Sequence, residues 1–389
     1  MNELSTYKTF IEIHQQPIVW MKEWQNVFEN QAYIKSFILN HQISKESEII
    51  LTGAGSSAFI GNTLSAFLMR QGYFHCKSVP TTDLITHPEY FLSTNKKLIL
   101  VSFARSGNSP ESVGVLKLAN KLCKNVAHVI ITCNKDGELV KNIDDKNSLV
   151  MLLPKEANDE GLAMTSSFTT MIIAFLLFIN IDQLDQQKIN LNDIIRSANL
   201  IFERHESQLQ KIASRQFDRA VFLGSGELKE ISEECQLKLQ ELTDGEVICK
   251  YDSFMGFRHG PKAILNEKTL LVYFFSNNEY VYQYEKDLVQ QINLNNKIAG
   301  QIAVSEFKIN ISGVHFDAEI LLNNTNKTYD FGFISYVLIG QLLGFFKSLL
   351  LNLNPDKPSI SGKISRVVEG VKIYNNYNII LKSKNNGEA

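Results

Sequence analysis

The sequence predicts an α/β protein in which one pattern of strands and helices occurs twice. Short apolar stretches alternate with helical stretches through most of the chain. Uninterrupted apolar strands that alternate with helices are typical of a parallel sheet covered by helices on both faces. Four of these strands recur in the same order about 171 residues later, as Leu51 and Phe222 illustrate. This constant spacing favours duplication of a domain, although a generic α/β chain can also alternate by coincidence.

Composition excludes some classes of protein. The chain has 389 residues, of which 44% are apolar and 21% charged, so it can bury the cores of two or three domains and is not a disordered chain. Lys and Arg number 39 and Asp and Glu 41, which gives a net charge of −2. This balance argues against a basic nucleic-acid clamp, and we expect no nucleic-acid partner.

Cysteine usage and the lengths of the apolar segments favour a soluble cytoplasmic protein. The five cysteines are scattered with no C-x-x-C spacing, which argues against a disulfide framework and against structural zinc. The first residues lack the basic start and apolar core of a signal peptide. The longest apolar run, Met171–Ile179, is too short to cross a bilayer. We therefore expect no membrane association, no metal and no other cofactor.

The first half begins with helices and continues as alternating strands and helices. Residues 1–45 carry apolar side chains at helical spacing, with Pro17 where a helix would begin. Strands are then expected at Ile49–Thr52, Lys97–Ser102, His128–Thr132 and Leu149–Leu153. Helices are expected at Ala58–Gln71, from Pro110 onward, and at Ser166–Asn180.

The second half repeats this order. Its expected elements are strands at Ala220–Leu223, Thr269–Phe275, Gln301–Val304 and Glu319–Leu322, then a long apolar helix at Phe331–Leu353. A polar helical segment, residues 190–214, joins the halves. The predicted organisation is N-terminal helices at 1–45, a first domain at 46–185, a linking helix at 186–215, and a second domain with a C-terminal segment at 216–381.

Two loops of the first half have the composition of an anion site. Ligands of open parallel sheets bind beyond the carboxyl ends of the strands, and both loops follow strands. Glycine lets backbone N–H groups approach an anion, a helix N-terminus favours negative charge, and serine adds donors. Ordinary turns and N-caps are the alternative. The candidate phosphate-binding residues are Gly55, Ser56, Ser57, Arg105, Ser106, Asn108 and Ser109.

A dinucleotide-binding fold is a second alternative for the first loop. Gly53-x-Gly55-x-x-Ala58 formally matches the fingerprint of that fold. The fingerprint also expects an acidic residue that ends the second strand, for which Asp83 is the available candidate. The hydroxyl-rich loop at Ser106–Ser109 has no role in that scheme, which favours the phosphate site.

A third hydroxyl cluster opens the long helix that begins near Ser166. The cluster, Met164–Thr169, includes Thr165 and Ser166. Their hydroxyls are expected either to cap the helix or to line the phosphate site, and the sequence does not separate these roles.

The second half carries acid–base candidates. Glu234, Lys238 and Glu241 stand at i, i+4 and i+7 of one predicted helix and so share a face. A solvated salt-bridge face is the alternative, but neighbouring leucines indicate that much of this helix is buried. His259 lies in a loop, Asp252–Lys262, that glycines and a proline shape around it. An imidazole in such a setting is a candidate proton donor and acceptor.

At these residues the sequence resembles the sugar isomerase (SIS) superfamily, with two SIS domains in tandem. It is most similar to the galactosamine-6-phosphate deaminase/isomerases, also known as tagatose-6-phosphate ketose/aldose isomerases. The matching segments span nearly the whole chain: GAGSSAFIG (53–61), TTDLITHPEY (81–90), SFARSGNSPES (102–112), AMTSSFTTM (163–171), DSFMGFRHGPKA (252–263) and NPDKPSISGKISRVVEGV (354–371).

The resemblance implies two flavodoxin-like domains, each a five-stranded parallel sheet in an α-β-α sandwich. It also implies a phosphosugar held by Ser56, Ser57, Ser106 and Ser109. The isomerase domain of glucosamine-6-phosphate synthase is a more distant relative, and its glutamate–lysine–glutamate motif is similar to Glu234, Lys238 and Glu241. Its catalytic glutamate matches Glu241, its ring-opening histidine matches His259, and its C-terminal lysine falls near Lys363. Relatives assemble as dimers or larger, so a homodimer or homotetramer is expected.

The expected reaction follows from this resemblance and from the residue types. No glutaminase domain or N-terminal cysteine nucleophile is evident, so the chain would release ammonia from an amino sugar or isomerise without ammonia. We expect conversion of galactosamine 6-phosphate to tagatose 6-phosphate and ammonia, with His259 opening the ring and Glu241 moving a proton between C2 and C1. Lys238 would favour the carboxylate or stabilise negative charge on oxygen. The alternatives are a plain ketose/aldose isomerase and a non-catalytic phosphosugar-binding regulator.

Overall fold

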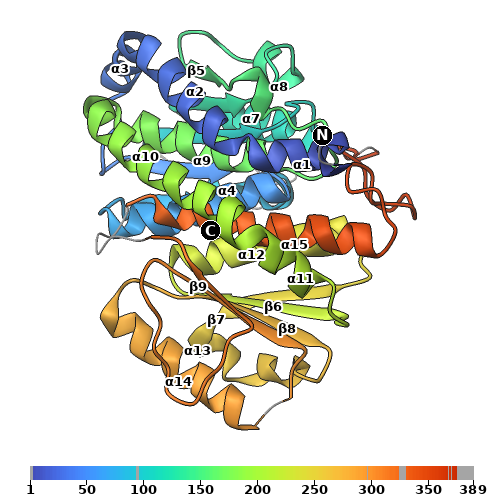
Figure 1. Ribbon diagram of the computed structural model, residues 1–389. Coiled ribbons are helices and arrows are strands. Elements are labelled where there is room, and N and C mark those ends of the chain that lie inside the picture. The colour runs from blue at the N-terminus through green and yellow to red at the C-terminus, as the bar shows by residue number, and fades with distance from the viewer. Residues whose placement is uncertain are drawn as a thin grey trace, which may run out of the picture. The chain divides into compact units, whose positions relative to one another are not determined.

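The computed structural model describes residues 3–92, 96–295, 297–323, 330–366, 368 and 370–374. By internal contacts the chain forms two compact units, of which unit A comprises Tyr33–Leu152 and Val367–Ala389 and unit B comprises Met1–Ala32 and Leu153–Arg366. Each unit contains one five-stranded parallel sheet (Figure 1). The predicted fold class is therefore confirmed, whereas the predicted domain boundaries stay predictions.

In unit A the strand order is β2-β1-β3-β4-β5. The helices α5 and α7 pack on one face through a cluster that includes Leu84, Leu100 and Val115. The strands are β1 (Glu48–Thr52), β2 (Cys76–Ser78), β3 (Leu98–Ala104), β4 (Val126–Thr132) and β5 (Ser148–Leu152). The helices are α3 (Gln31–Asn40), α4 (Ser56–Arg70), α5 (Thr81–Thr86), α6 (Pro88–Phe91), α7 (Pro110–Leu122) and α8 (Glu138–Lys141).

In unit B the strand order is β10-β9-β8-β6-β7. The strands are β6 (Arg219–Gly224), β7 (Ile248–Ser253), β8 (Thr269–Phe274), β9 (Gly300–Ser305) and β10 (Ala318–Leu321). The helices are α1 (Lys8–His14), α2 (Gln16–Glu29), α9 (Ser166–Ile179), α10 (Leu184–Leu200), α11 (Glu206–Ala213), α12 (Glu227–Leu242), α13 (Phe254–Phe257), α14 (Glu279–Asn295) and α15 (Val337–Leu350). A π-helical turn, Ile201–His205, joins α10 to α11, and a 3-10 turn, Gly332–Tyr336, precedes α15.

The two sheets have the same topology and the same register. In each half the second strand lies at the edge beside the first, and the third strand lies on the first strand's other side. Leu51 pairs with Val101 in unit A, and Phe222 pairs with Val272 in unit B, so both partners are shifted by the same 171 residues. This agreement supports the duplication inferred from the strand spacing.

The sequence missed one strand in each half, and both are edge strands. β2 has only three residues, and β7 is exposed or half-exposed along its whole length. An edge strand needs no continuous apolar run because one side of it faces solvent. Six of the eight predicted strands are buried along nearly their whole length, and the other two, the edge strands β5 and β10, are partly buried. The observed bounds of all eight agree with the prediction to within about two residues.

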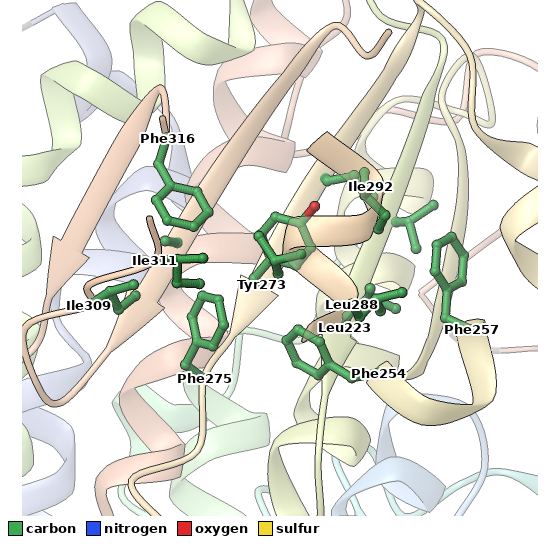
Figure 2. Close-up of a cluster of buried hydrophobic side chains, with 14 residues drawn as sticks. Leu223, Phe254, Phe257, Tyr273, Phe275, Leu288, Ile292, Ile309, Ile311 and Phe316 are labelled. Atoms are coloured by element: carbon green, nitrogen blue, oxygen red, sulfur yellow. The ribbon is translucent and has the colours of Figure 1, made fainter. Parts of the chain in front are cut away.

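The core of unit B is rich in aromatic residues on the face of the sheet that α13 and α14 cover. Figure 2 shows Phe254 and Phe257 from α13 packed with Leu288 of α14 against Tyr273 and Leu223 of the sheet. The ring of Phe254 stacks on that of Tyr273 at 5.9 Å between centroids. This packing fixes α13, and therefore fixes the loop that follows it.

Helices α9 and α15 form the apolar centre of unit B on the other face. Nearly every residue of both helices is buried, and α2 packs against α9 while α12 and α11 pack against α15. The helical stretch Gly332–Leu350 is long and apolar enough to cross a membrane, but 89% of it is buried inside the protein. It has the character of a core helix.

A buried carboxyl group makes the stability of unit B depend on pH. Glu23 of α2 is fully buried; its Oε2 accepts a hydrogen bond from Asn26 Nδ2 at 3.3 Å, and its Oε1 has no partner among the described residues. Burial raises the pKa of Glu23 to about 8. Burial also raises the pKa of Glu12 and that of Glu285, each to about 7. These groups favour the protonated form in the folded state.

We expect Glu23→Gln to stabilise the protein at high pH. A carboxyl whose folded pKa is raised contributes its full stability below the unfolded pKa, near 4.5, and loses it as pH rises toward about 8. Because glutamine stays neutral, the variant should unfold at a higher Tm than the wild type at pH 8 and at a similar Tm at pH 5. The shift corresponds to about 2–4 kcal/mol by linkage. Calorimetry from pH 5 to 8.5 is the measurement.

Glu29→Gln is the matched control, because Glu29 lies on the same helix and is exposed. This variant should follow the wild-type profile. Parallel Tm profiles for Glu23→Gln and the wild type would show that Glu23 does not titrate in this range.

Candidate active site

The structure places the two predicted phosphate loops beyond the carboxyl ends of two neighbouring strands of the unit A sheet. β1 and β3 are neighbours in the sheet. β2 lies on the other side of β1, so the order in which strands are added to the sheet changes direction at β1. The first loop leads into α4 with Gly55 as its N-cap, and the second leads into α7 with Ser109 as its N-cap. Neither helix has a side-chain hydrogen bond at its cap, so the positive ends of both helix dipoles face these strand ends uncapped.

Glycines determine the shape of the first loop. Gly55 has φ +58° and ψ −132°, a conformation that residues with a side chain rarely adopt. A Cβ at Gly53 would lie 2.6 Å from the backbone carbonyl of Ser57, which is too close for any side chain. Ser56 and Ser57 begin α4 and are largely buried at this turn. The loop therefore brings backbone and hydroxyl donors together as an anion site requires.

The second loop is held rigidly by its neighbours. Asn134 Nδ2 donates to the carbonyl of Ser106 at 2.8 Å, and Asn108 Oδ1 accepts from the N–H of Glu138 at 3.0 Å. Arg105 is buried, whereas the sequence alone left a solvent-facing orientation open. The roles of Gly55, Ser56, Ser57, Arg105, Ser106, Asn108 and Ser109 in binding a ligand stay predictions.

Unit B repeats the loop geometry but not its chemistry. Gly226 has φ +58° and ψ −133°, which matches Gly55 almost to the degree. Glu227 and Leu228 stand where unit A has Ser56 and Ser57. Beside this turn the carboxyl group of Glu285 accepts hydrogen bonds from Ser225 Oγ at 2.7 Å and from the N–H of Ser276 at 2.9 Å. A side chain of the protein itself occupies these donors, so the hydroxyl-rich candidate anion loops belong to unit A.

Helix α12 carries the acid–base candidates as a buried cluster. Lys238 is 1% exposed, and its Nζ lies 2.5 Å from Glu241 Oε2 and 3.4 Å from Glu234 Oε1. The Glu234 side chain is fully buried, and that of Glu241 is 18% exposed. The cluster is therefore not a solvated surface face. The ion pair fixes the carboxylate of Glu241, which of the three groups has the most access to solvent.

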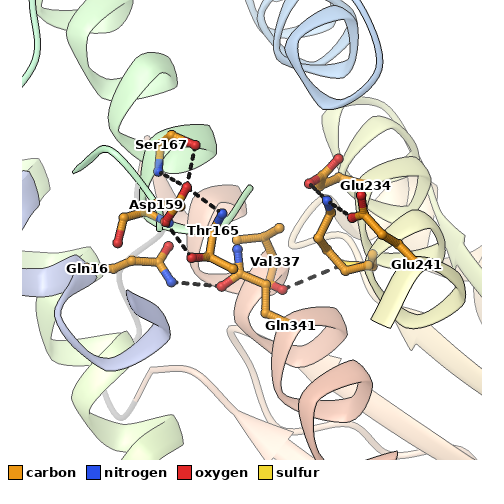
Figure 3. Close-up of polar contacts among 11 residues, drawn as sticks. Gln16, Asp159, Thr165, Ser167, Glu234, Glu241, Val337 and Gln341 are labelled. Atoms are coloured by element: carbon orange, nitrogen blue, oxygen red, sulfur yellow. Dashed lines mark hydrogen bonds and ion pairs between the residues drawn. The ribbon is translucent and has the colours of Figure 1, made fainter. Parts of the chain in front are cut away.

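Two glycines of α15 allow α12 to approach closely. A Cβ at Gly340 would lie 2.5 Å from Cys235 Cα, and a Cβ at Gly344 would lie 2.9 Å from the carbonyl oxygen of Lys238. Figure 3 shows α15 between the Lys238 cluster and Gln16 of α2, whose Nε2 donates to Gln341 Oε1 at 2.7 Å. Backbone contact at these glycines is what buries Lys238.

Asp159 organises the start of α9. Its two carboxylate oxygens accept from the N–H groups of Thr165, Ser166 and Ser167 at 2.9–3.0 Å (Figure 3). The hydroxyl of Thr165 donates to the same carboxylate at 2.7 Å, and that of Ser166 donates to the carbonyl of Glu12 at 2.7 Å. Both hydroxyls are thus already bonded inside unit B. A ligand-binding role for Thr165 and Ser166 stays a prediction.

His259 and Lys363 are both exposed, unlike the buried cluster of α12. His259 is exposed in the loop after α13, and among the described contacts none joins its imidazole to Glu241 or Lys238. Lys363 is also exposed, but Ser361, two residues before it, is bonded to Asp244 just beyond α12. Among the described residues no group of three or more His, Cys, Asp or Glu side chains is arranged to hold a metal ion.

Comparison with known proteins identifies the family. Residues 42–181 match the SIS domain family. The D-galactosamine-6-phosphate deaminase AgaS of Shewanella sp. strain ANA-3 is 34% identical over 96% of this chain and 93% of its own length. The AgaS deaminase of Escherichia coli is 36% identical over 93% and 94%. The chain belongs to the D-galactosamine-6-phosphate deaminase AgaS family.

A solved structure extends this family relationship to the fold. The tagatose-6-phosphate ketose/aldose isomerase of Escherichia coli is 33% identical, with a TM-score of 0.86 over 95% of this chain and 97% of its own. The resemblance derived from the sequence motifs is therefore confirmed, as is the tandem SIS architecture.

Sequence reasoning missed two acidic residues that shape the candidate site of this family member. Asp159 holds the turn before α9, and Glu111 lies buried in the first turn of α7 beside the second loop, with its Oε2 unpartnered among the described residues. Glu111 was visible only as an acid favourable to a helix dipole. Asp159 gave no local signal, because it lies six residues before Thr165, the N-cap of the helix whose start it holds.

We expect Gly340→Ala to destabilise unit B through α12. The added methyl group would meet the backbone of Cys235, which a side-chain rotation cannot relieve, so the helices must separate. Overpacking of this kind lowers the free energy of unfolding by about 1–3 kcal/mol. Denaturant titration is the measurement. Gly114→Ala on α7 is the matched control, since its methyl would mainly meet the flexible tip of Ile85. Equal stability of Gly340→Ala and the wild type would contradict the close crossing.

Proposed function

We propose that this chain converts galactosamine 6-phosphate and water to tagatose 6-phosphate and ammonia. The observation that carries the proposal is the buried Lys238–Glu241 pair, which presents a fixed carboxylate in a chain of the AgaS family. A regulator that only binds a phosphosugar has no need of a buried lysine beside a partly exposed glutamate. A plain ketose/aldose isomerase is the second candidate, because the related Escherichia coli structure bears that name.

We also propose that the enzyme works in the cytoplasm, where its five free cysteines stay reduced.

The phosphate of the substrate is proposed to bind at the two loops of unit A. Ser56, Ser57, Ser106 and Ser109 supply hydroxyl donors, and the uncapped starts of α4 and α7 supply N–H groups and positive dipole ends. Hydrogen bonds to a charged group are worth about 1.5–3 kcal/mol each, so the phosphate is the main source of affinity.

The chemistry requires proton transfers of different geometry at the ring oxygen and at carbon. His259 moves a proton between O1 and O5 to open the pyranose ring, which suits an imidazole because its ring nitrogens can accept and donate a proton. Glu241 then removes the C2 proton and returns it to C1, while O1 gains a proton and the amino nitrogen loses one to solvent, so the aldehyde becomes a hydroxymethyl group and C2 becomes an imine. Water adds to the imine and ammonia leaves, which gives the ketose. The ammonium group of Lys238 offsets the negative charge of the Glu241 carboxylate before Glu241 removes the C2 proton.

Turnover by the wild type and by Glu241→Gln tests the proposed function. The wild type should release ammonia from galactosamine 6-phosphate, and much less from unphosphorylated galactosamine. Glutamine keeps the shape of Glu241 but cannot accept the proton, so kcat should fall by about 10²–10⁴. Glucosamine 6-phosphate and tagatose 6-phosphate, assayed in parallel, separate the galacto from the gluco preference and the deaminase from the isomerase.

Glu246→Gln is the matched control, since Glu246 is exposed five residues further along. It should keep the wild-type rate. Ammonia release by Glu241→Gln at the native rate would assign the base to another residue, with Glu234 next in line.

We propose that the enzyme is a homo-oligomer in which His259 completes a site on a second copy. The support is that His259 is exposed and makes no side-chain contact with the acid–base cluster among the described residues. Co-expression of Glu241→Gln with His259→Asn, each inactive alone, should then restore activity, because mixed dimers contain one site with both native residues. Random pairing gives about a quarter of the wild-type rate. Absence of any recovery would place His259 and Glu241 in the same copy's site.

A further inference from the structure

Asp244 adopts the left-handed backbone conformation, which is uncommon outside glycine. Three non-glycine residues in the described part of the chain have positive φ: Gln42 at 49°, Asp244 at 48° and Asn352 at 57°. These residues follow the ends of α3, α12 and α15, respectively. In each case the residue after the positive-φ residue donates its N–H to the carbonyl of the residue five positions before itself. Glycine is the usual residue at this position because it has no Cβ.

An aspartate is less favourable than glycine at the end of α12 for two reasons. The left-handed conformation costs a residue with a Cβ more than it costs glycine, although aspartate and asparagine tolerate it better than most residues. In addition, the C-terminus of a helix is the negative end of its dipole, where a carboxylate is repelled. Strain that persists at one residue indicates that its side chain has another role, which the surrounding contacts identify.

The contacts of Asp244 are with the C-terminal strap, defined here as residues 354–366. Asp244 Oδ2 accepts from the N–H of Ser361 at 3.2 Å, and Asp244 Oδ1 accepts from Ser361 Oγ at 3.0 Å. These hydrogen bonds, led by the one from the Ser361 N–H, and the charge of Lys363 lower the pKa of Asp244. Ser361 Oγ in turn accepts from the N–H of Lys363 at 3.4 Å. A chain of contacts therefore runs from Asp244 through Ser361 to the backbone of Lys363.

The strap is also anchored at both of its ends within unit B. Near its start, the Asp356 carboxylate accepts from the N–H groups of Lys8 and Thr9 at 3.0 and 2.8 Å. At its end, the Arg366 guanidinium donates to Asn158 Oδ1 at 2.9 Å and to the carbonyl of Asp159. Between these anchors, Asp244 holds the middle of the strap, three residues after Glu241.

We propose that Asp244 is a positioning residue that holds the C-terminal strap, and Lys363 with it, beside the turn of α12 that carries Glu241. This inference rests on the proposed function and on the expectation, from the resemblance to relatives with a C-terminal lysine near this position, that Lys363 binds the phosphosugar. Gln42 and Asn352 share the backbone conformation, but within the described residues neither side chain joins a second segment through a hydrogen bond, so the strain at Asp244 has a distinct reason.

Replacement of Asp244 by glycine separates this role from a structural one. Glycine relieves the left-handed strain, so Asp244→Gly should fold with an unchanged or higher Tm. Loss of the strap contact should raise KM for galactosamine 6-phosphate about tenfold and leave kcat nearly unchanged, as expected for lost substrate binding. Lys363→Ala should raise KM similarly, and the double variant should show no further rise.

Two further variants complete the design. Asp244→Asn tolerates the left-handed conformation and keeps one oxygen acceptor, so it should recover most of the native KM. Gln42→Gly is the matched control, since it relieves the same strain at the end of α3 and should keep the native KM. A native KM in Asp244→Gly, or additive effects of Asp244→Gly and Lys363→Ala, would overturn the proposal.

A readout without substrate keeps failure of this inference distinct from failure of the proposed function. Trypsin cleavage of the Lys363–Ile364 bond, followed by mass spectrometry of the intact enzyme, reports how firmly the strap is held. Cleavage should be about tenfold faster in Asp244→Gly than in the wild type or in Gln42→Gly. Equal cleavage rates would show that Asp244 does not hold the strap, whatever the enzyme's substrate proves to be.

Discussion

The close crossing of α12 and α15 is the constraint on which the candidate chemistry of unit B depends. Gly340 and Gly344 let the two helix backbones touch, and this contact removes Lys238 from water. A buried ammonium is tolerated only when it is paired, so Glu234 and Glu241 must stand one turn away on either side of it. The orientation of the Glu241 carboxylate is therefore a consequence of helix packing, established before any substrate arrives. Such preorganisation is what lets a carboxylate act as a base without reorganising at the moment of reaction.

Duplication followed by divergence explains why the two halves share geometry but not chemistry. The glycine turns at Gly55 and Gly226 have nearly the same φ and ψ, whereas the turn before α7 does not share them, so the two glycine turns are equivalent loops of the duplicated unit. The residues after each turn are free to change. Unit A keeps serines and therefore donors for an external anion, whereas unit B places Glu285 on its donors and satisfies them internally. One half thus became specialised for holding an anion, and the other could evolve the acid–base cluster of α12.

The parts of the molecule that the sequence predicted are those whose signals are local. Buried strands are recognisable as apolar runs, and the motifs at Gly53–Ser57 and Asp252–Lys262 are recognisable from their own residues, so the fold class could be predicted and candidate site residues could be named. Edge strands such as β7 were missed because half of their surface faces solvent. Asp159 and Asp244 were missed for a different reason. Asp159 acts on N–H groups six to eight residues later, outside the range of an ordinary N-cap, and Asp244 acts on a segment 117 residues away that only tertiary structure brings to it. An isolated aspartate in a sequence carries no trace of such a partner.

Glu23 and Asp244 both occupy positions that cost free energy, but only one of them indicates function. The hydrogen-bond partners of each residue distinguish the two cases. Glu23 is costly because it is buried, yet its one hydrogen bond among the described residues is to Asn26 on its own helix, so its burial affects stability and pH dependence alone. Asp244 is costly because of its backbone and its place at a helix end, and its hydrogen bonds reach a separate segment that continues to Lys363. When an unfavourable residue is stabilised only by contacts within its own helix, as Glu23 is, its replacement need not alter the candidate site. A cost that is offset by joining two elements is maintained only while their joint position matters, and in this protein those elements are the helix of Glu241 and the C-terminal strap.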